Sequence, residues 1–198
     1  MNSNSSEDSL DEIIKCVVSS NLKRLEELVP NEPPIVPQFP VCGKWRKNIT
    51  LLHLAASYGS LTCIEFCLPK ININAQTEDG WTPLHCAATN RHQSAVELLL
   101  KNRANPNIYN SDKVFFIINL VPLHLASING SSEVILSLLN AGVDANATSN
   151  IGFNAIHYAA KTSLSSVIDP LIIAGADFDL ASILSNKIYK VSHNLIFS

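Results

Sequence analysis

The sequence is poor in the features that mark several large classes of protein. Only 16% of its 198 residues are charged, and its formal net charge of −3 indicates no general affinity for nucleic acid or anionic membranes. Two small basic clusters, around Lys23 and Arg46, are interpreted as solvated patches. No apolar run reaches the length of about 18 residues that predicts a membrane-spanning helix. We therefore expect neither a nucleic-acid nor a membrane partner.

Signs of secretion are also missing. Residues 1–11 are rich in Ser, Asn and acidic side chains, whereas a signal peptide has a basic region followed by an apolar one. The cysteines are odd in number and show no disulfide spacing pattern: Cys16, Cys42, Cys63, Cys67 and Cys86. Both observations predict a protein of the cytoplasm or the nucleus.

Catalytic motifs are lacking as well. The chain has no Cys-x-x-Cys pair, His-Glu-x-x-His, Gly-rich phosphate loop or Gly-x-Ser-x-Gly elbow. Cys63 and Cys67 are four residues apart and could supply half of a zinc site on one helix face. The alternative is that both are small core residues. We expect no enzyme and no cofactor, and stoichiometric zinc in the pure protein would revive an enzyme that uses these cysteines and a histidine.

What the chain does contain is a unit repeated four times. The histidines that mark it, His53, His85, His124 and His157, are separated by 32, 39 and 33 residues. A Leu or Ile precedes each histidine, small residues follow it by two and three positions, and nearly all residues at eleven, fourteen and fifteen positions after it are large and apolar. The small residues allow helices to pack closely, and the later residues form an apolar stripe on a second helix. Because one helical hairpin cannot bury such a stripe alone, the repeat predicts a stack.

The best-formed copy lies within residues 80–107. Its Thr82-Pro83-Leu84-His85, followed by Ala87-Ala88, Val96 and Leu99-Leu100, resembles the ankyrin repeat. The resemblance implies an all-α ankyrin-repeat solenoid of helix-turn-helix units with β-turn or hairpin loops, which binds other proteins. It also implies that the repeated histidine is structural, with ring nitrogens that form hydrogen bonds within and between repeats. Cys67 stands where the other copies have Leu, which favours its interpretation as a core residue.

Breaks in the repeat pattern divide the chain into segments. They are a disordered lead-in (1–9), a degenerate N-terminal helical cap repeat (10–30), a Pro-rich loop (31–47), four ankyrin repeats (48–79, 80–113, 120–151 and 152–180) interrupted by an apolar insertion (114–119), and an irregular C-terminal tail (181–198). The Pro-rich segment is a surface loop or a ligand for an SH3 or WW domain. The insertion is a binding element, an aggregation-prone segment or an artefact of the gene model.

Three local expectations concern helix ends. Gly142 and Gly175 stand where second helices should end and supply the left-handed conformation needed there. Arg103 takes this place in the second repeat, where we expect the helix end to be less favourable in energy than with glycine. Pro170 should bend or shorten the last helix.

The resemblance also implies where a partner binds, because ankyrin-like stacks hold partners by their loop tips and the inner face of their first helices. The matching partner-binding positions are Tyr58, Glu78, Asp79, Trp81, Asn90, Asn129, Phe153 and Thr162. The aromatic residues among them are assigned to exposed positions, with packing on neighbouring loops as the alternative.

We expect a monomeric adaptor, scaffold or inhibitor that binds one or more unidentified proteins through the concave face and loop fingers. The alternative is a substrate-recognition or regulatory fragment of a larger multidomain protein such as a ubiquitin-ligase receptor.

Overall fold

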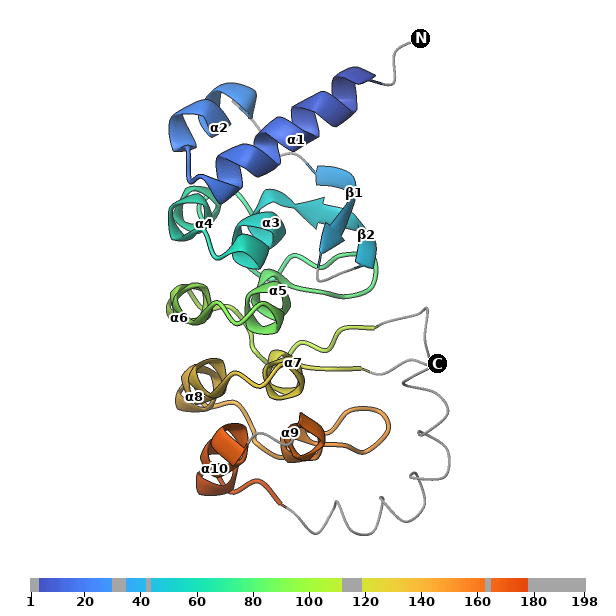
Figure 1. The fold of residues 1–198 in the computed structure, drawn as a ribbon, viewed down its shortest axis with the longest axis vertical. Coiled ribbons are helices and arrows are strands. Elements are labelled where there is room, and N and C mark those ends of the chain that lie inside the picture. The colour runs from blue at the N-terminus through green and yellow to red at the C-terminus, as the bar shows by residue number, and fades with distance from the viewer. Residues whose placement is uncertain (1–3, 30–34, 42–43, 112–118, 163–164, 178–198) are drawn as a thin grey trace.

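A computed structural model describes residues 4–29, 35–41, 44–111, 119–162 and 165–177, which form an elongated stack of helical hairpins (Figure 1). In Figure 1 the even-numbered helices form one column and the odd-numbered helices lie beside it. The long loops between hairpins project beyond the odd-numbered helices, away from the even-numbered column. The all-α solenoid expected from the repeat is confirmed. In chain order, the helices are α1 (Asn4–Val18), α2 (Leu22–Leu28), α3 (Leu51–Tyr58), α4 (Leu61–Cys67), α5 (Pro83–Thr89), α6 (Gln93–Lys101), α7 (Pro122–Ile128), α8 (Ser132–Asn140), α9 (Ala155–Thr162) and α10 (Ser165–Ile173).

The core runs through the stack as the repeat pattern requires. The first, odd-numbered helix of each hairpin is called the inner helix, and the second, even-numbered helix the outer helix. The paired small residues, such as Ala55 with Ala56 and Ala87 with Ala88, are completely buried in the inner helices. The apolar stripes of the outer helices are buried too, as at Val96 and Leu99 in α6. These residues belong to one continuous cluster, so each hairpin is stabilised by its neighbours.

Cys63 and Cys67 lie inside this core. Both side chains have no exposed surface, and burial raises the pKa of the Cys67 thiol to about 12. Such a thiol stays protonated and packs as a small apolar group. Within the described ranges, no three side chains of the metal-binding types come together.

Local sequence explains where the helices begin and end. Thr82 caps α5, and Pro83 occupies its first turn, where a missing N–H costs nothing. Gly142 and Gly175 follow α8 and α10 with φ angles of 81° and 82°, as expected. Arg103 adopts the same left-handed conformation after α6 with φ of 69°, which strains a residue that has a Cβ.

The expectation that Pro170 shortens the last helix is corrected. Helix α10 has nine residues, the same length as α6 and α8, and continues three residues beyond the proline. Pro170 removes one backbone hydrogen bond near the end of the helix, and the buried side chains of Val167 and Leu171 hold this helix in the stack.

The assignment of 31–47 as a loop is also corrected, because most of this segment forms a β-hairpin. Strand β1 (Ile35–Val41) pairs antiparallel with β2 (Lys44–Thr50). Prolines are tolerated in so short a ribbon because its edges need not be paired. The pair of Pro37 with Asn48 is missing from the otherwise regular ladder, and Asn48 has a positive φ of 59°. Pro37 has no N–H to donate, which accounts for the local break.

Helix α1 begins at Asn4, so the prediction of disorder for 1–9 is wrong for residues 4–9. The tail 181–198 and all of the insertion 114–119 except Asn119 lie outside the described residues.

Candidate protein-interaction surface

The inner helices end at equivalent positions that contribute to one side of the stack. The predicted binding residues there are Tyr58 in α3, Asn90 after α5, Asn129 after α7 and Thr162 in α9. Tyr58 is 42% exposed, and Ile128 at the end of α7 is 39% exposed. The side chain of Thr162 lies outside the described part. Tyr58 and Ile128 therefore offer accessible apolar area on a helical scaffold.

Asn90 and Asn129 are half-buried and have structural roles in addition. The Asn90 amide donates to the backbone oxygen and the hydroxyl of Ser57, both at 2.9 Å. The Asn129 amide donates to the Leu125 oxygen of its own inner helix at 2.9 Å. Their remaining exposed surface can contact a partner, but their amide donors are committed to the stack.

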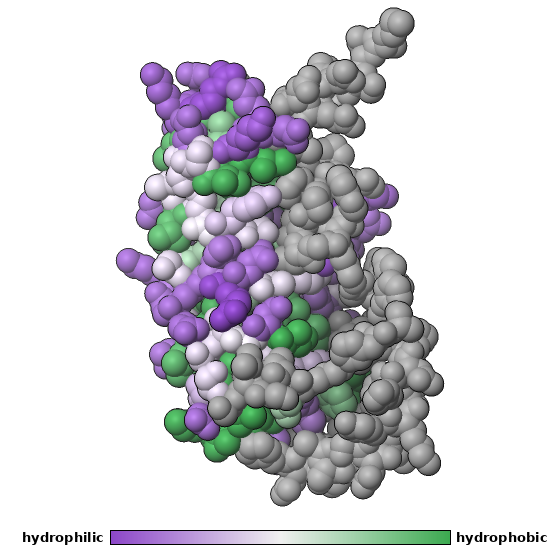
Figure 2. Space-filling model, in the orientation of Figure 1, coloured by the Kyte–Doolittle hydropathy of each residue, from purple (hydrophilic) through white to green (hydrophobic). Residues whose placement is uncertain are grey.

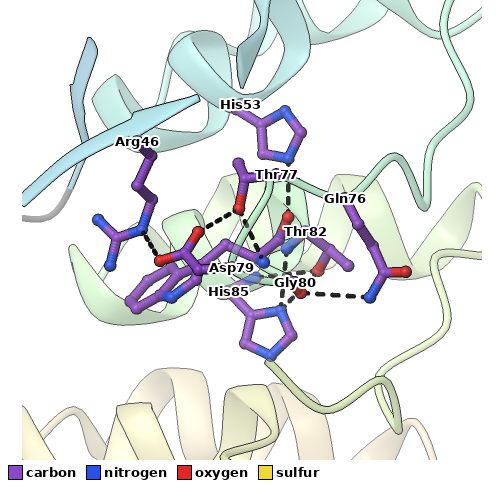
Figure 3. Close-up of polar contacts among 9 residues, drawn as sticks. Arg46, His53, Gln76, Thr77, Asp79, Gly80, Thr82 and His85 are labelled. Carbon is purple, nitrogen blue, oxygen red and sulfur yellow. Dashed lines mark hydrogen bonds and ion pairs between the residues drawn. The ribbon is translucent and has the colours of Figure 1, made fainter. Parts of the chain in front are cut away.

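Each loop that leads from an outer helix to the next inner helix is called a finger. The finger before α5, residues 68–82, is fixed by the β-hairpin, as Figure 3 shows. Arg46 of β2 donates from Nε to Asp79 Oδ2 at 2.8 Å, and its side chain is 2% exposed. Its guanidinium carbon lies 4.0 Å from the centroid of the Trp81 ring, which is a cation–π contact. We call these three residues the Arg46 clamp. The clamp joins the hairpin to the next finger across more than thirty residues of sequence.

Trp81 is a correction to the predicted surface. It was assigned to an exposed position, but only 5% of it is exposed, because it lies under Arg46 and beside His85. The sequence contains a signal for this burial: the residue four positions before each repeated histidine is apolar in every copy, at Ile49, Trp81, Leu120 and Phe153. A position that is apolar in all copies is expected to face the core.

Arg46 is the second correction, since its cluster was interpreted as solvated. Arg46 is buried, whereas Lys47 beside it is exposed. No local feature of residues 44–47 distinguishes the two cations, because the partner that buries Arg46 lies in another repeat.

The two acidic residues of this finger differ in their surroundings. Asp79 accepts from Arg46 and, at 2.6 Å, from the Thr77 hydroxyl, so its carboxylate shapes the turn. The Glu78 side chain is 56% exposed and lies 3.9 Å from Lys47. An exposed pair of this kind contributes little to stability, which leaves Glu78 accessible to a partner.

Phe153 on the finger before α9 is partly exposed. Its ring stacks on His157 with the ring centroids 5.0 Å apart and meets Tyr158 edge-on at 5.8 Å. Tyr109 on the finger before α7 is 41% exposed and was not among the predicted residues. The repeat pattern gives no signal for it, because its position varies between copies.

The repeated histidines support the surface without lying on it. Nδ1 accepts from the backbone N–H at the start of the same helix, as from Thr82 to His85 at 3.2 Å. In His53, His85 and His124, Nε2 contacts a backbone oxygen of the following finger, as at 3.0 Å from His85 to Leu120. Desolvation lowers the pKa of His53, His85 and His124 to about 4, so these rings are neutral near pH 7. Their structural role is as expected.

The described surface mixes polar and apolar side chains. On the side of the molecule drawn in Figure 2, hydrophilic and hydrophobic residues are interspersed, without one apolar area that dominates the coloured surface. Across the part of the chain that the structure covers, no helix has both the length and the apolarity to cross a bilayer.

A stack of helical hairpins with a histidine at a fixed position, buried in three of the four copies, and with projecting fingers defines a repeat-type interaction scaffold. Residues 13–110 and 113–182 match the family model described as ankyrin repeats in three copies. The chain belongs to the ankyrin repeat family, whose members are generally protein-interaction modules.

Known proteins from several sources are similar to this chain. A putative ankyrin repeat protein of fowlpox virus (strain NVSL), FPV031, is 31% identical over 157 residues, which are 75% of this chain and 44% of that protein. Neurogenic locus notch homolog protein 1 of Xenopus laevis is 33% identical over 119 residues, 60% of this chain and 4% of that protein. The mouse B-cell lymphoma 3 protein homolog is 30% identical over 140 residues, 68% of this chain and 30% of that protein. The chain thus spans less than half the length of each of these relatives.

Proposed function

We propose that this chain is a non-catalytic protein-binding module that acts as an adaptor, scaffold or inhibitor. The observation that carries the proposal is a set of accessible large side chains, two at inner helix ends and one on a finger: Tyr58, Tyr109 and Ile128. These residues are about 40% exposed, at 42%, 41% and 39%, although they are large and apolar. Tyrosines and large apolar side chains contribute much of the energy of protein interfaces.

Rigid positioning supports the same role. The finger before α5 is held by the Arg46 clamp and by the contact of His53 Nε2 with the Trp81 oxygen at 3.0 Å. A surface that is ordered before binding loses less conformational entropy when a partner docks. We infer that the exposed Glu78 and the accessible edges of Asn90, Asn129 and Phe153 surround the apolar contacts.

The test is affinity capture followed by mass spectrometry, with a double variant Tyr58→Ala/Ile128→Ala. Its matched control is Leu136→Ala, because Leu136 is 47% exposed but lies on the outer helix α8. We expect the double variant to lose specific partners and the control to retain them, with unchanged circular dichroism in both. Equal capture by folded wild type and folded double variant would contradict the assignment of this surface.

A second possibility is a substrate-recognition or regulatory part of a larger protein, such as a ubiquitin-ligase receptor. It is supported by the relatives, because the chain matches only 44% of the fowlpox protein and smaller parts of the others. Detection of the native protein with an antibody against α5–α8 distinguishes the two. A mass near 21.6 kDa favours the separate module, and a much larger mass favours the multidomain protein.

We further propose that the protein is a monomer in the cytoplasm or nucleus and binds neither nucleic acid nor membranes. The low net charge of −3 supports the absence of electrostatic attraction to phosphate surfaces. Light scattering, fluorescence microscopy of a tagged chain, and sedimentation with vesicles or DNA test these points separately.

A further inference from the structure

The joints on the two sides of the α5–α6 hairpin are built differently. At the joint with α3–α4, Ser57 receives two hydrogen bonds from the Asn90 amide, at its backbone oxygen and its hydroxyl, each 2.9 Å long. His92 Nε2 lies 3.0 Å from the same backbone oxygen. These contacts cross from one hairpin to the next at the turns between inner and outer helices. They close the turn side of this joint.

The joint with α7–α8 has different contacts at the equivalent positions, Thr89, Asn129 and Ser131. The Asn129 amide donates to Leu125 of its own helix at 2.9 Å, and the Ser131 hydroxyl donates to Glu133 of the same hairpin at 3.3 Å. The Thr89 hydroxyl is buried and has no hydrogen-bond partner. Among these described residues, no hydrogen bond crosses the joint. A buried polar atom left without a partner destabilises the closed arrangement.

The two joints differ because their turns have different residues at two equivalent positions. The His92 ring packs so closely on Gly59 that a Cβ there would lie 2.7 Å from it. At the second joint Arg91 stands in the place of Gly59, and Ser131 stands in the place of His92. Arg91 has a Cβ in the space that the ring needs. The sequence of the second turn therefore excludes the bridge that the first turn forms.

The finger side, in contrast, is bonded at both joints. His53 contacts the Trp81 oxygen at 3.0 Å at the first joint, and His85 contacts the Leu120 oxygen at 3.0 Å at the second. The second joint also has a bond of 2.9 Å between the Ser137 hydroxyl and Glu97 of the outer helices, but it is exposed to water. Exposed hydrogen bonds of this kind hold a joint weakly.

We propose that the joint between α5–α6 and α7–α8 is the hinge of the stack. The β-hairpin and α3–α6 form one cooperative block. Helices α7–α10 form another, which is joined by the contact of His124 Nε2 with the Ala147 oxygen at 2.8 Å and by the edge-on packing of His124 and Tyr158. The second joint is fixed at the finger side. Its turn side has apolar packing and the electrostatic attraction of Arg91 to Glu133, but no hydrogen bond from Thr89, Asn129 or Ser131 crosses it. Opening there changes the angle between the part of the surface that contains Tyr58 and the part that contains Ile128, while each block keeps its own core. This inference concerns the stack itself, and its test needs no partner.

The test is hydrogen exchange measured by mass spectrometry at increasing urea concentration. We expect peptides from α7–α10 to open at lower urea than peptides from α3–α6, with opening equilibria that differ roughly tenfold. Coincident exchange of both blocks in the wild-type chain would overturn the proposal.

A triple variant, Thr89→Ser/Arg91→Gly/Ser131→His, transfers the first turn into the second joint, where Asn129 already matches Asn90. We expect it to bring the two exchange transitions together. Persistence of the full difference in the folded triple variant would count against the hinge. The converse variant Gly59→Ala displaces the His92 ring and should separate α3–α4 from α5–α6. Unchanged coupling in that variant would show that the turn contacts do not join the hairpins.

Discussion

Mild acid should destabilise this stack because three of its repeated histidines are buried in the neutral form. His53, His85 and His124 have no exposed surface, and desolvation lowers the pKa of each to about 4. In the unfolded chain these groups titrate near their usual pKa of about 6.5. The unfolded state therefore binds more protons between these two values. The stability that the neutral rings contribute is complete above about pH 6.5 and is lost as the pH falls towards 4.

Hydrogen-bond geometry gives the same direction independently. The backbone N–H of Val121 donates to His124 Nδ1 at 3.1 Å, so this nitrogen is an acceptor without a proton. Protonation of Nδ1 would bring two donors together and leave a charge in the core. At His53 and His85 the hydroxyls of Thr50 and Thr82 also contact Nδ1, at 2.8 and 2.7 Å. His124 has no such hydroxyl to turn its oxygen towards a new proton.

The magnitude follows from linkage. Between about pH 7 and pH 5, one histidine with these two pKa values reduces the free energy of unfolding by about 2 kcal/mol. Three such residues together give about 5–6 kcal/mol, which is comparable with the total stability of an ordinary domain, about 5–15 kcal/mol. Below the folded pKa of about 4 the loss levels off, since both states are then protonated.

Urea unfolding followed by circular dichroism at a series of pH values measures this loss. The variant His124→Gln removes one titrating group and should reduce the slope of stability against pH by roughly a third, whatever it costs near pH 7. A free energy of unfolding that stays constant down to about pH 5 would refute the reasoning, as would an unchanged slope in the variant.

Three further predictions concern single side chains. Arg46→Met should lower the free energy of unfolding in urea titrations by about 3 kcal/mol, because Asp79 loses its buried partner. The control Lys47→Met should change it by less than about 1 kcal/mol. Equal effects of the two substitutions would contradict the role of the Arg46 clamp. Arg103→Gly should raise stability by about 1 kcal/mol because Arg103 has a φ of 69°, and a loss would show that its side chain has a role. Gly59→Ala should lower the thermal midpoint, because the new Cβ would lie 2.7 Å from the His92 ring; an unchanged midpoint would show that this ring moves freely.

The helical units could be predicted because their determinants are local and repeated. A histidine with a small pair and an apolar triplet recurs in every copy, and the structure places these residues in the same environments each time. The β-hairpin was missed because its prolines argue against strands. Its pairing with the next finger depends on Arg46 and Asp79, which are 33 residues apart and give no signal within either segment.

The binding surface was predicted less well than the fold for a related reason. Positions next to the repeat signature were assigned by their distance from it, although burial depends on what the neighbouring repeat places there. Trp81 is buried by Arg46 of the preceding hairpin, and Tyr109 is exposed at a position whose residue type varies between copies.

Comparison of equivalent positions separates scaffold from surface in this stack. Positions that are apolar or histidine in every copy, including that of Trp81, are explained by the core and by contacts between repeats. Positions at the inner helix ends differ between copies, with Tyr58, Asn90 and Asn129 at one of them, and they keep accessible surface. Because these side chains lie outside the core, packing within the stack does not determine which residue type stands there. Selectivity for a partner therefore has to come from these variable side chains. They are divided between the block of the β-hairpin and α3–α6 and the block of α7–α10, so under the proposed hinge their relative orientation depends on the joint after α6.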